Sequence, residues 1–222
     1  FAATAAFGFL TARHGNRFGM LVAGGAAGAN GASAGGLRLG PSSTRAQLLA
    51  SLSKLYDLPR RVQRADGDTD LLSVLHSLER ARPRRGQVIV ISDFLDDTEW
   101  SPAVARLAQA HQVLCVQIVD PRELAIPAAG MLTLVDTETG RDIHVQSNSS
   151  ALRDRYAAAA KARHEMISRR IRDAGSEHLV LSTDSDWLIE IVRFVAGRKT
   201  LRRHASRSQH QRDRARRLRS VP

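Results

Sequence analysis

Three aspartates follow an apolar segment near the middle of the chain. Residues 88–92 read VIVIS, and Asp93, Asp96 and Asp97 come directly after them. A short apolar run of this kind is typical of a strand buried in a parallel sheet. Ligands of such sheets bind beyond the carboxyl ends of the strands. Carboxylate oxygens are hard ligands that suit Mg²⁺, so this position is a candidate metal site.

A hydroxyl upstream of this strand adds a second candidate ligand. Thr69 lies in DGDTDLL, where a segment with leucines at helical spacing begins. The loop that carries it is expected at the same sheet edge as Asp93, so Thr69 and Asp93 are the candidate Mg²⁺ ligands. A structural interpretation stays open beside this one. Thr69 is also a good helix cap, and the acids from Asp93 to Asp97 are favoured where a helix starts.

The same aspartates permit a catalytic interpretation. Haloacid-dehalogenase-type phosphatases carry DxD after a strand, with one aspartate as the nucleophile. Here Asp93 and Asp96 are three residues apart in DFLDD, which departs from that motif. A Mg²⁺-dependent phosphatase that uses Asp93 therefore stays an alternative. The Gly-rich segment 24–36 fits neither GxGxxG nor GxxxxGK, so we interpret it as a loop without a phosphate site.

Composition limits the remaining classes of protein. The chain has 222 residues, of which 43% are hydrophobic, enough to bury a sizeable core. Its one cysteine, Cys115, lies in the apolar run VLCVQIV, which predicts a buried and inert thiol. An internal disulfide and a Cys-based zinc site are excluded. No apolar run has the length of a membrane span and nothing reads as a signal peptide, so we expect a cytoplasmic protein.

The positive charge is concentrated at one end. Residues 198–222 contain ten Lys or Arg and one Asp, a net charge of +9 within the chain's +11, so the remainder carries +2. This segment has few apolar residues and is predicted to be a disordered basic tail. It serves either solubility or non-specific contact with anionic lipid or nucleic acid. We expect one domain over residues 1–197 followed by this tail over 198–222.

Helical and strand patterns alternate along the domain. Strands are predicted at 17–23, 36–39, 88–92, 113–119 and 178–182, and a hairpin at 131–146. Helices are predicted at 1–13, 43–56, 150–174, from 71 to before Pro83, from about 101 and over 184–195. We expect Ser42 or Ser43, and Thr183 or Asp184, as caps, and Gly175 as a helix end. Such alternation favours an α/β fold with a mostly parallel sheet and helices on both faces.

The succession of these segments resembles a known bacterial family. GDTDLLSVLHSLER, RRGQVIVISDFLDD, QVLCVQIVDPRE, MLTLVDTETG and TDSDWLIEIVRFV follow one another as in domain of unknown function 58. That family is von Willebrand factor A-like and is often encoded beside MoxR-type AAA+ ATPases. The resemblance covers roughly residues 1–198. It implies a doubly wound, mostly parallel sheet with a metal-ion-dependent adhesion site at its carboxyl edge.

The resemblance assigns roles to particular residues. The adhesion site takes DxSxS from the first strand, a Thr from a second loop and an Asp from a third. Thr69 matches the second element and Asp93 the third, whereas none of the fifteen Asp residues has Ser two places on. Because residues 1–13 resemble the helix that follows DxSxS, we expect that element and the central first strand just upstream of Phe1. Asp96 and Asp97 are then helix-start acids or charges at the rim.

Two expectations about architecture and function follow from the resemblance. The predicted strands at 17–23 and 88–92 should flank a gap rather than pair directly. The function implied is a non-enzymatic, protein-binding adaptor that holds Mg²⁺ and works with a MoxR-type AAA+ ATPase and protein clients. The alternatives are the phosphatase that uses Asp93 and nucleic-acid binding through the basic tail.

Overall fold

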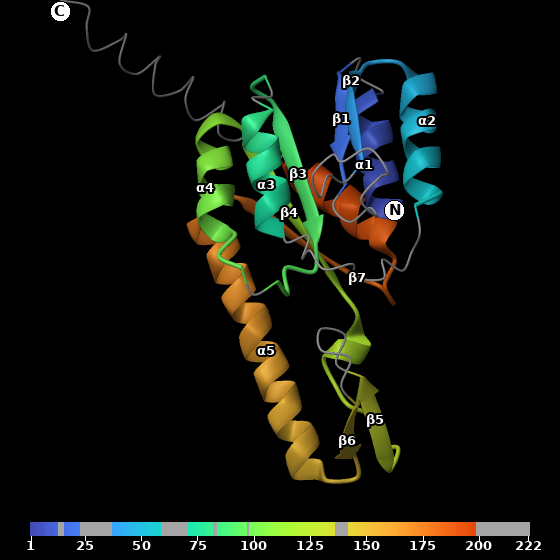
Figure 1. The fold of residues 1–222 in the computed structure, drawn as a ribbon, viewed down its shortest axis with the longest axis vertical. Helices are drawn as coiled ribbons and strands as arrows, with labels where there is room; N and C mark the ends of the chain where they lie inside the picture. Colours follow the sequence, from blue (N-terminus) through green and yellow to red (C-terminus); the bar gives the residue numbers. More distant parts are fainter. Residues whose placement is uncertain are drawn as a thin grey trace, which may run out of the picture. The chain divides into compact units, whose positions relative to one another are not determined.

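The computed structural model describes residues 1–12, 16–22, 37–58, 71–81, 84–96, 98–135 and 142–198. The chain divides into two compact units, 1–184 and 185–222. The helices of the first unit are α1 (Ala2–Ala12), α2 (Arg45–Tyr56), α3 (Leu71–Arg80), α4 (Ser101–Ala110), the 3₁₀ turn η1 (Pro121–Glu123) and α5 (Ser150–Asp173). Its strands are β1 (Phe18–Leu21), β2 (Arg38–Ser42), β3 (Gln87–Ser92), β4 (Gln112–Val119), β5 (Met131–Val135), β6 (Asp142–Gln146) and β7 (Glu177–Ser182) (Figure 1). The second unit contains a helix at 187–198.

A three-stranded parallel sheet forms the centre of the first unit. Its strand order is β3-β4-β7, with β4 in the middle. Val90 is aligned with Cys115 and Cys115 with His178, so these side chains share one face of the sheet. The expectation of an α/β fold with parallel strands is confirmed at this level.

Helices α3, α4 and α5 cover that face (Figure 1). The buried cluster joins Leu75 of α3, Val104 of α4 and Ile171 of α5 to Val90 and Cys115 of the sheet. Full burial of a side chain such as Ile171 contributes roughly 1.5–3 kcal/mol. Cys115 is buried as predicted, and burial raises the pKa of its thiol to about 11, which disfavours the reactive thiolate.

Two antiparallel pairs accompany the parallel sheet. β1 pairs with β2, and β5 with β6, which confirms the predicted hairpin. Among the described residues no ladder joins β1 to β3, in agreement with the expectation that these strands do not pair.

Helix α1 packs against α2 at Gly8, where a Cβ would lie 2.7 Å from Leu48 Cδ1. Glycine therefore permits the close approach of the two helices.

Most predicted boundaries agree with the structure, and two predicted caps were wrong. The α2 cap is Thr44, whose hydroxyl accepts from the Gln47 N–H at 3.3 Å, rather than Ser42 or Ser43. β2 continues to Ser42, so the helix begins later than predicted.

For helix 187–198 the cap is Asp186, which accepts from the Ile189 N–H at 3.2 Å, rather than Thr183 or Asp184. A capping oxygen must lie beside the free N–H groups of the first turn, so the later start of the helix decides which residue caps it. At the other end of α5, Gly175 has φ +73, as a helix end requires.

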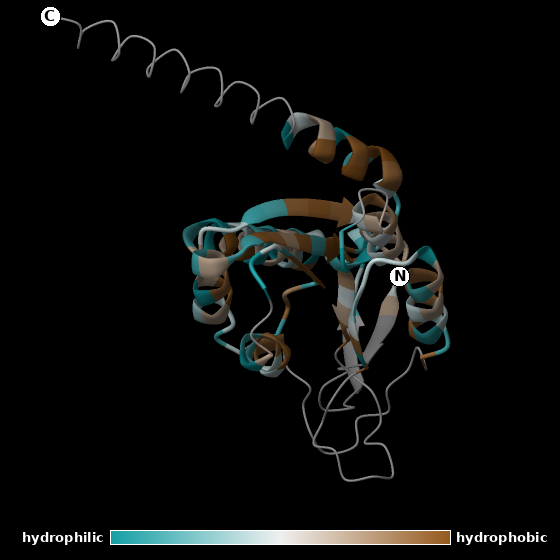
Figure 2. Ribbon diagram, turned by 90° about the horizontal axis from the view of Figure 1, so that it is seen from above, coloured by the Kyte–Doolittle hydropathy of each residue, from teal (hydrophilic) through white to brown (hydrophobic). Residues whose placement is uncertain are grey.

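Apolar residues lie along the strands, whereas the helices show mixed colouring in Figure 2, as expected for helices with one covered face. None of the described helices is long and apolar enough to span a bilayer. The predicted basic tail falls on residues 198–222, of which 199–222 lie outside the described residues. The domain boundary at residue 197 therefore stays a prediction.

Candidate functional site at the carboxyl edge of the parallel sheet

The loop that leaves β3 is held by its own side chains. Asp93 is exposed, and its Oδ1 accepts from the backbone N–H of Leu95 at 3.2 Å. The Ser92 hydroxyl accepts from the Phe94 N–H at 3.1 Å and donates to Asp93 Oδ1 at 3.4 Å. These contacts form a tight turn immediately after the strand. The Asp93 carboxylate therefore has a defined place at the sheet edge.

Phe94 anchors this turn in the core. Its backbone has φ +59, a left-handed conformation that costs a non-glycine residue about 1–2 kcal/mol. Its ring is nonetheless 2% exposed and packs on Trp100, with ring centroids 5.1 Å apart. Burial of an aromatic side chain contributes enough to offset that cost. The reversed backbone turns the phenyl ring inward while its neighbour Asp93 stays in solvent.

Asp96 joins the same loop to helix α3. Its Oδ2 accepts from the Leu71 N–H at 2.7 Å and its Oδ1 from the Thr98 N–H at 2.7 Å. Burial acts to raise the pKa of Asp96, but the hydrogen bonds from Thr98 and Leu71 outweigh it and lower the pKa. Asp96 is therefore a helix-start acid as expected, although for the preceding helix α3 and not for α4, which begins at Ser101.

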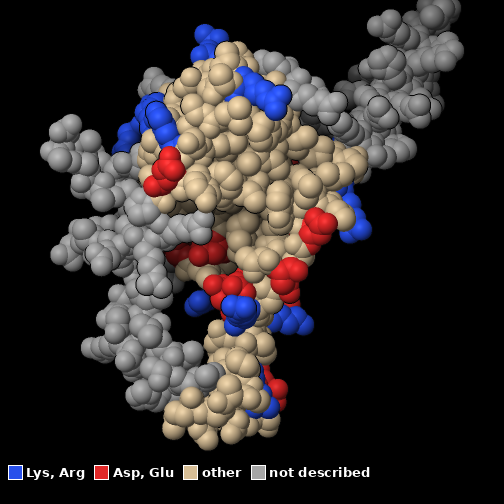
Figure 3. All heavy atoms as spheres, turned by 90° about the vertical axis from the view of Figure 1, so that its right-hand side faces the viewer, with Lys and Arg blue, Asp and Glu red and all other residues tan. Residues whose placement is uncertain are grey.

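Further acids lie where β4 ends. Asp120 accepts from the Arg122 N–H at 3.0 Å and caps η1. The pKa of Glu123 is raised by burial and by the charges of Asp120 and Asp93, and is lowered in part by His164. Asp93, Asp120 and Glu123 therefore share one electrostatic environment, which we call the acidic edge. Figure 3 shows Asp and Glu side chains gathered about midway along one face, with Lys and Arg beside them.

A buried amide lies beneath this edge. Gln117 of β4 is 1% exposed, and its Nε2 donates to the Asp93 carbonyl at 3.4 Å and to His164 Nδ1 at 3.1 Å. Its Oε1 accepts from His178 Nε2 at 3.1 Å. Gln117 was missed by the sequence analysis, although a polar residue inside the apolar run VLCVQIV was a usable signal. Buried polar groups need partners, and these partners come from a loop, a helix and a strand.

The predicted metal ligands are only partly within the described structure. Asp93 lies at the carboxyl end of β3 as expected, whereas Thr69 and Asp97 lie outside the described residues. In the part of the chain that is described, no three His, Cys, Asp or Glu side chains gather closely enough to hold a metal ion. Asp93 supplies one carboxylate there, and its Oδ1 is occupied by the Leu95 N–H.

Comparison with known proteins gives the family. Residues 1–166 match the family described as "Protein of unknown function DUF58". The chain belongs to the DUF58 family. The resemblance on which the sequence analysis relied is confirmed for the family itself.

Relatives of this DUF58 chain occur in mycobacteria. "Uncharacterized protein Rv1480" of Mycobacterium tuberculosis is 37% identical over 202 residues, which cover 89% of this chain and 59% of the relative. "Uncharacterized protein MAV169" of Mycobacterium avium is 39% identical over 132 residues, covering 59% of this chain and 76% of the relative. The chain thus spans about 59% of the length of Rv1480.

Two solved structures are similar to the DUF58 chain at a lower level. "Conserved hypothetical protein BatB from Bacteroides thetaiotaomicron" matches with a TM-score of 0.42 and 17% identity, over 78% of this chain and 87% of that one. An "Uncharacterized Membrane Spanning Protein from Vibrio fischeri" matches with a TM-score of 0.24 and 12% identity, over 88% and 83%.

Proposed function

We propose that this DUF58 domain is a non-enzymatic, protein-binding module of the von Willebrand factor A-like type, which presents the acidic edge to a partner. The observation that carries the proposal is an exposed carboxylate on a fixed backbone. Asp93 faces solvent, while Phe94 is buried beside it and Asp96 ties the loop to α3. A preorganised loop favours binding because little ordering has to accompany the contact.

The proposal includes a Mg²⁺ ion held by Asp93 and Thr69. In the described hydrogen bonds Asp93 uses Oδ1, which leaves Oδ2 for a cation. Mg²⁺ takes one or two protein carboxylates and keeps several waters, so it suits a site with few protein ligands. When bound, the ion would supply an under-neutralised positive charge that attracts an acidic group of the partner.

The proposed partner is a MoxR-type AAA+ ATPase, together with protein clients, in the cytoplasm. This part rests on the family resemblance. Because the chain spans about 59% of the length of Rv1480, the test uses the full-length protein. Binding of a purified MoxR-type AAA+ ATPase is measured by biolayer interferometry, with Mg²⁺ and with a chelator.

The decisive variant is Asp93→Ala, which should weaken ATPase binding at least tenfold and abolish its dependence on Mg²⁺. Asp57→Asn is the matched control, because Asp57 is an exposed acid at the end of α2 whose capping contact uses only its backbone. It should bind like the wild type. Equal binding by all three proteins, or binding indifferent to the chelator, would contradict the proposal.

Two further variants, Asp93→Asn and a deletion of residues 198–222, test the two alternative functions. Release of phosphate from an aryl phosphate that requires Mg²⁺ and vanishes in Asp93→Asn would establish the phosphatase alternative. Nucleic-acid binding that falls steeply with salt and is lost on deletion of residues 198–222 would establish the third function.

A further inference from the structure

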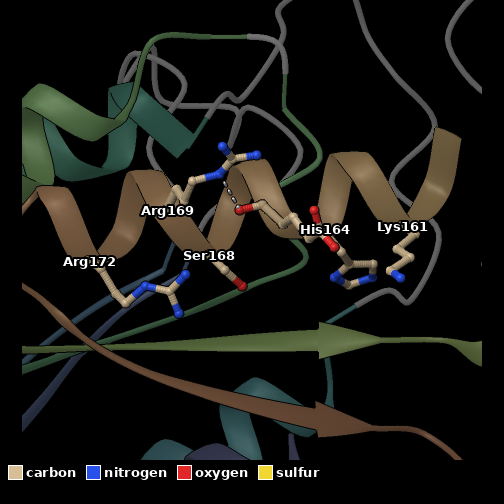
Figure 4. A pocket seen from close by; sticks show the side chains of 6 residues that line it. Lys161, His164, Ser168, Arg169 and Arg172 are labelled. Atoms are coloured by element: carbon tan, nitrogen blue, oxygen red, sulfur yellow. Dashed lines mark hydrogen bonds between the residues drawn. The ribbon is translucent and has the colours of Figure 1, made fainter. Parts of the chain in front are cut away.

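A groove of about 610 Å³ runs along α5, and none of the acidic edge residues lines it. Its volume is in the range of small-molecule sites. The lining side chains come from three successive turns of the helix: Lys161, His164, Glu165, Ser168, Arg169 and Arg172. Figure 4 shows Lys161, His164, Ser168 and Arg172 pointing from the helix toward the strands, whereas Arg169 points the other way. We call this feature the α5 groove.

The α5 groove is positively charged. Two cations, Lys161 and Arg172, point toward the strands; with the acid Glu165 they give a net charge of +1, leaving out Arg169, which points the other way, and counting His164 as neutral. Arg169 donates to the backbone carbonyl of Glu165 at 3.4 Å. In the part of the chain that the structure describes, no ion pair engages Lys161 or Arg172. Lysine and arginine side chains bind anionic groups through charge-assisted hydrogen bonds.

A second indication of positive electrostatic potential in the groove comes from His178 of the neighbouring strand β7. The pKa of His178 is lowered by burial and further by the positive charge of Arg172, and His164 adds to this effect in its protonated form. These two groove residues therefore lie close enough to His178 to act on it, and nearby acids do not cancel their effect. The field in the groove is positive, in contrast to the acidic edge.

Gln117 sets the orientation of His164. The Asp93 carbonyl can only accept, so the Gln117 atom facing it must be the amide NH₂, and the same NH₂ donates to His164 Nδ1. Neutral His164 therefore carries its proton on Nε2. Through this hydrogen bond the buried Gln117 amide leaves His164 Nε2–H as a donor among the groove residues, which also include the Ser168 hydroxyl.

We propose that the α5 groove binds a small phosphate-bearing ligand. Lys161 and Arg172 supply charge, and His164 Nε2–H and the Ser168 hydroxyl supply directional hydrogen bonds. A phosphate group offers three oxygens and up to two negative charges, which matches several donors spread along one helix face better than a carboxylate does. The proposal goes beyond the protein-binding role of the acidic edge and does not depend on it.

The test is a titration of the full-length protein with inorganic phosphate, followed by calorimetry and by hydrogen exchange of residues 161–172. We expect saturable binding and slower exchange in this segment. Arg172→Gln should weaken binding at least tenfold, and Lys161→Gln severalfold. Arg163→Gln is the matched control, because Arg163 is exposed on the same helix and does not line the groove. It should leave the affinity within twofold.

Vesicles of phosphatidylglycerol, with neutral vesicles as reference, form a second arm of the experiment. Binding of free phosphate without vesicle binding identifies a soluble ligand, whereas binding of both identifies a lipid headgroup. The proposal is overturned if no binding is detected at an inorganic phosphate concentration of about 1 mM, the upper end of typical Michaelis constants for metabolites. It is also overturned if Arg172→Gln and Arg163→Gln lose affinity equally. Lys161 is exposed, so its variant tests the groove even if Arg172→Gln is unstable.

Discussion

The acidic edge and the α5 groove lie on either side of Gln117 and differ in how their charges are held. The acids Asp93, Asp96 and Asp120 each accept a backbone N–H, so part of their role is to fix turns and helix starts. In the groove, Lys161 and Arg172 have no ion-pair partner among the described residues. Acids at the ends of strands can therefore be largely structural, because they stabilise turns and helix starts, whereas the cations of the groove lie on one helix face without an ion pair to another described residue.

Removal of the anchor of the acidic edge should have the largest effect. Phe94→Ala should lower the free energy of unfolding by about 3–5 kcal/mol, because the ring is buried against Trp100. Urea unfolding monitored by tryptophan fluorescence measures it. Phe9→Ala is the control, since Phe9 is 40% exposed and should change stability by less than about 0.5 kcal/mol. Equal losses in the two variants would show that the loop is not anchored by Phe94.

The Gln117 side chain links the acidic edge to the α5 groove, and loss of its amide should have the second-largest effect. Gln117→Leu keeps a similar volume but leaves the Asp93 carbonyl and His178 without their partner. An unsatisfied buried group costs roughly 1–3 kcal/mol, and because both groups are only partly buried we expect a total loss of about 1–3 kcal/mol in the free energy of unfolding. Chemical denaturation measures it, and imidazole resonances should show that His164 and His178 both change environment. A neutral or stabilising substitution would mean that the network does not join the two regions.

A smaller loss is expected when the charge of Asp96 is removed. Asp96→Asn should destabilise by about 0.5–1.5 kcal/mol at pH 7, because the amide NH₂ cannot accept one of the two backbone N–H groups that the carboxylate accepts. The folded-state pKa of Asp96 lies below its ordinary value of 3.8, so this stability is present above that pH and is lost as pH falls through the folded pKa. The difference in the free energy of unfolding between the wild type and Asp96→Asn should therefore become smaller at acidic pH. Asp57→Asn, the exposed control, should show no such narrowing.

The smallest predicted effect is a shift in the pKa of Glu123, whose sign depends on which of the two regions is changed. Glu123 senses both, because Asp93 raises its pKa and His164 lowers it. Asp93→Asn should thus lower the pKa of Glu123, and His164→Gln should raise it, with little change in stability. NMR titration of the Glu123 carboxyl measures both shifts. Shifts of the same sign would show that the acidic edge and the groove do not act on a common residue.

Local patterns in the sequence predicted most of the elements. The apolar run at 88–92, the leucine spacing after residue 71 and the end of α5 at Gly175 all correspond to the structure. These signals depend on periods of two or about four residues and on the conformational freedom of glycine, which are properties of the neighbouring chain. The position of Asp93 at the carboxyl end of a parallel strand follows from the same reasoning.

The tertiary structure alone decided which side chains act together. Asp96 caps a helix whose first N–H lies 25 residues away, and Gln117 bonds to His164 and His178 at separations of 47 and 61 residues. No periodic pattern encodes such contacts, because they depend on how β3, β4, α5 and β7 are placed beside one another. The local sequence pattern thus predicted strand β3 and the place of Asp93 at its carboxyl end. Only folding brought a buried amide between an acidic edge and a basic groove.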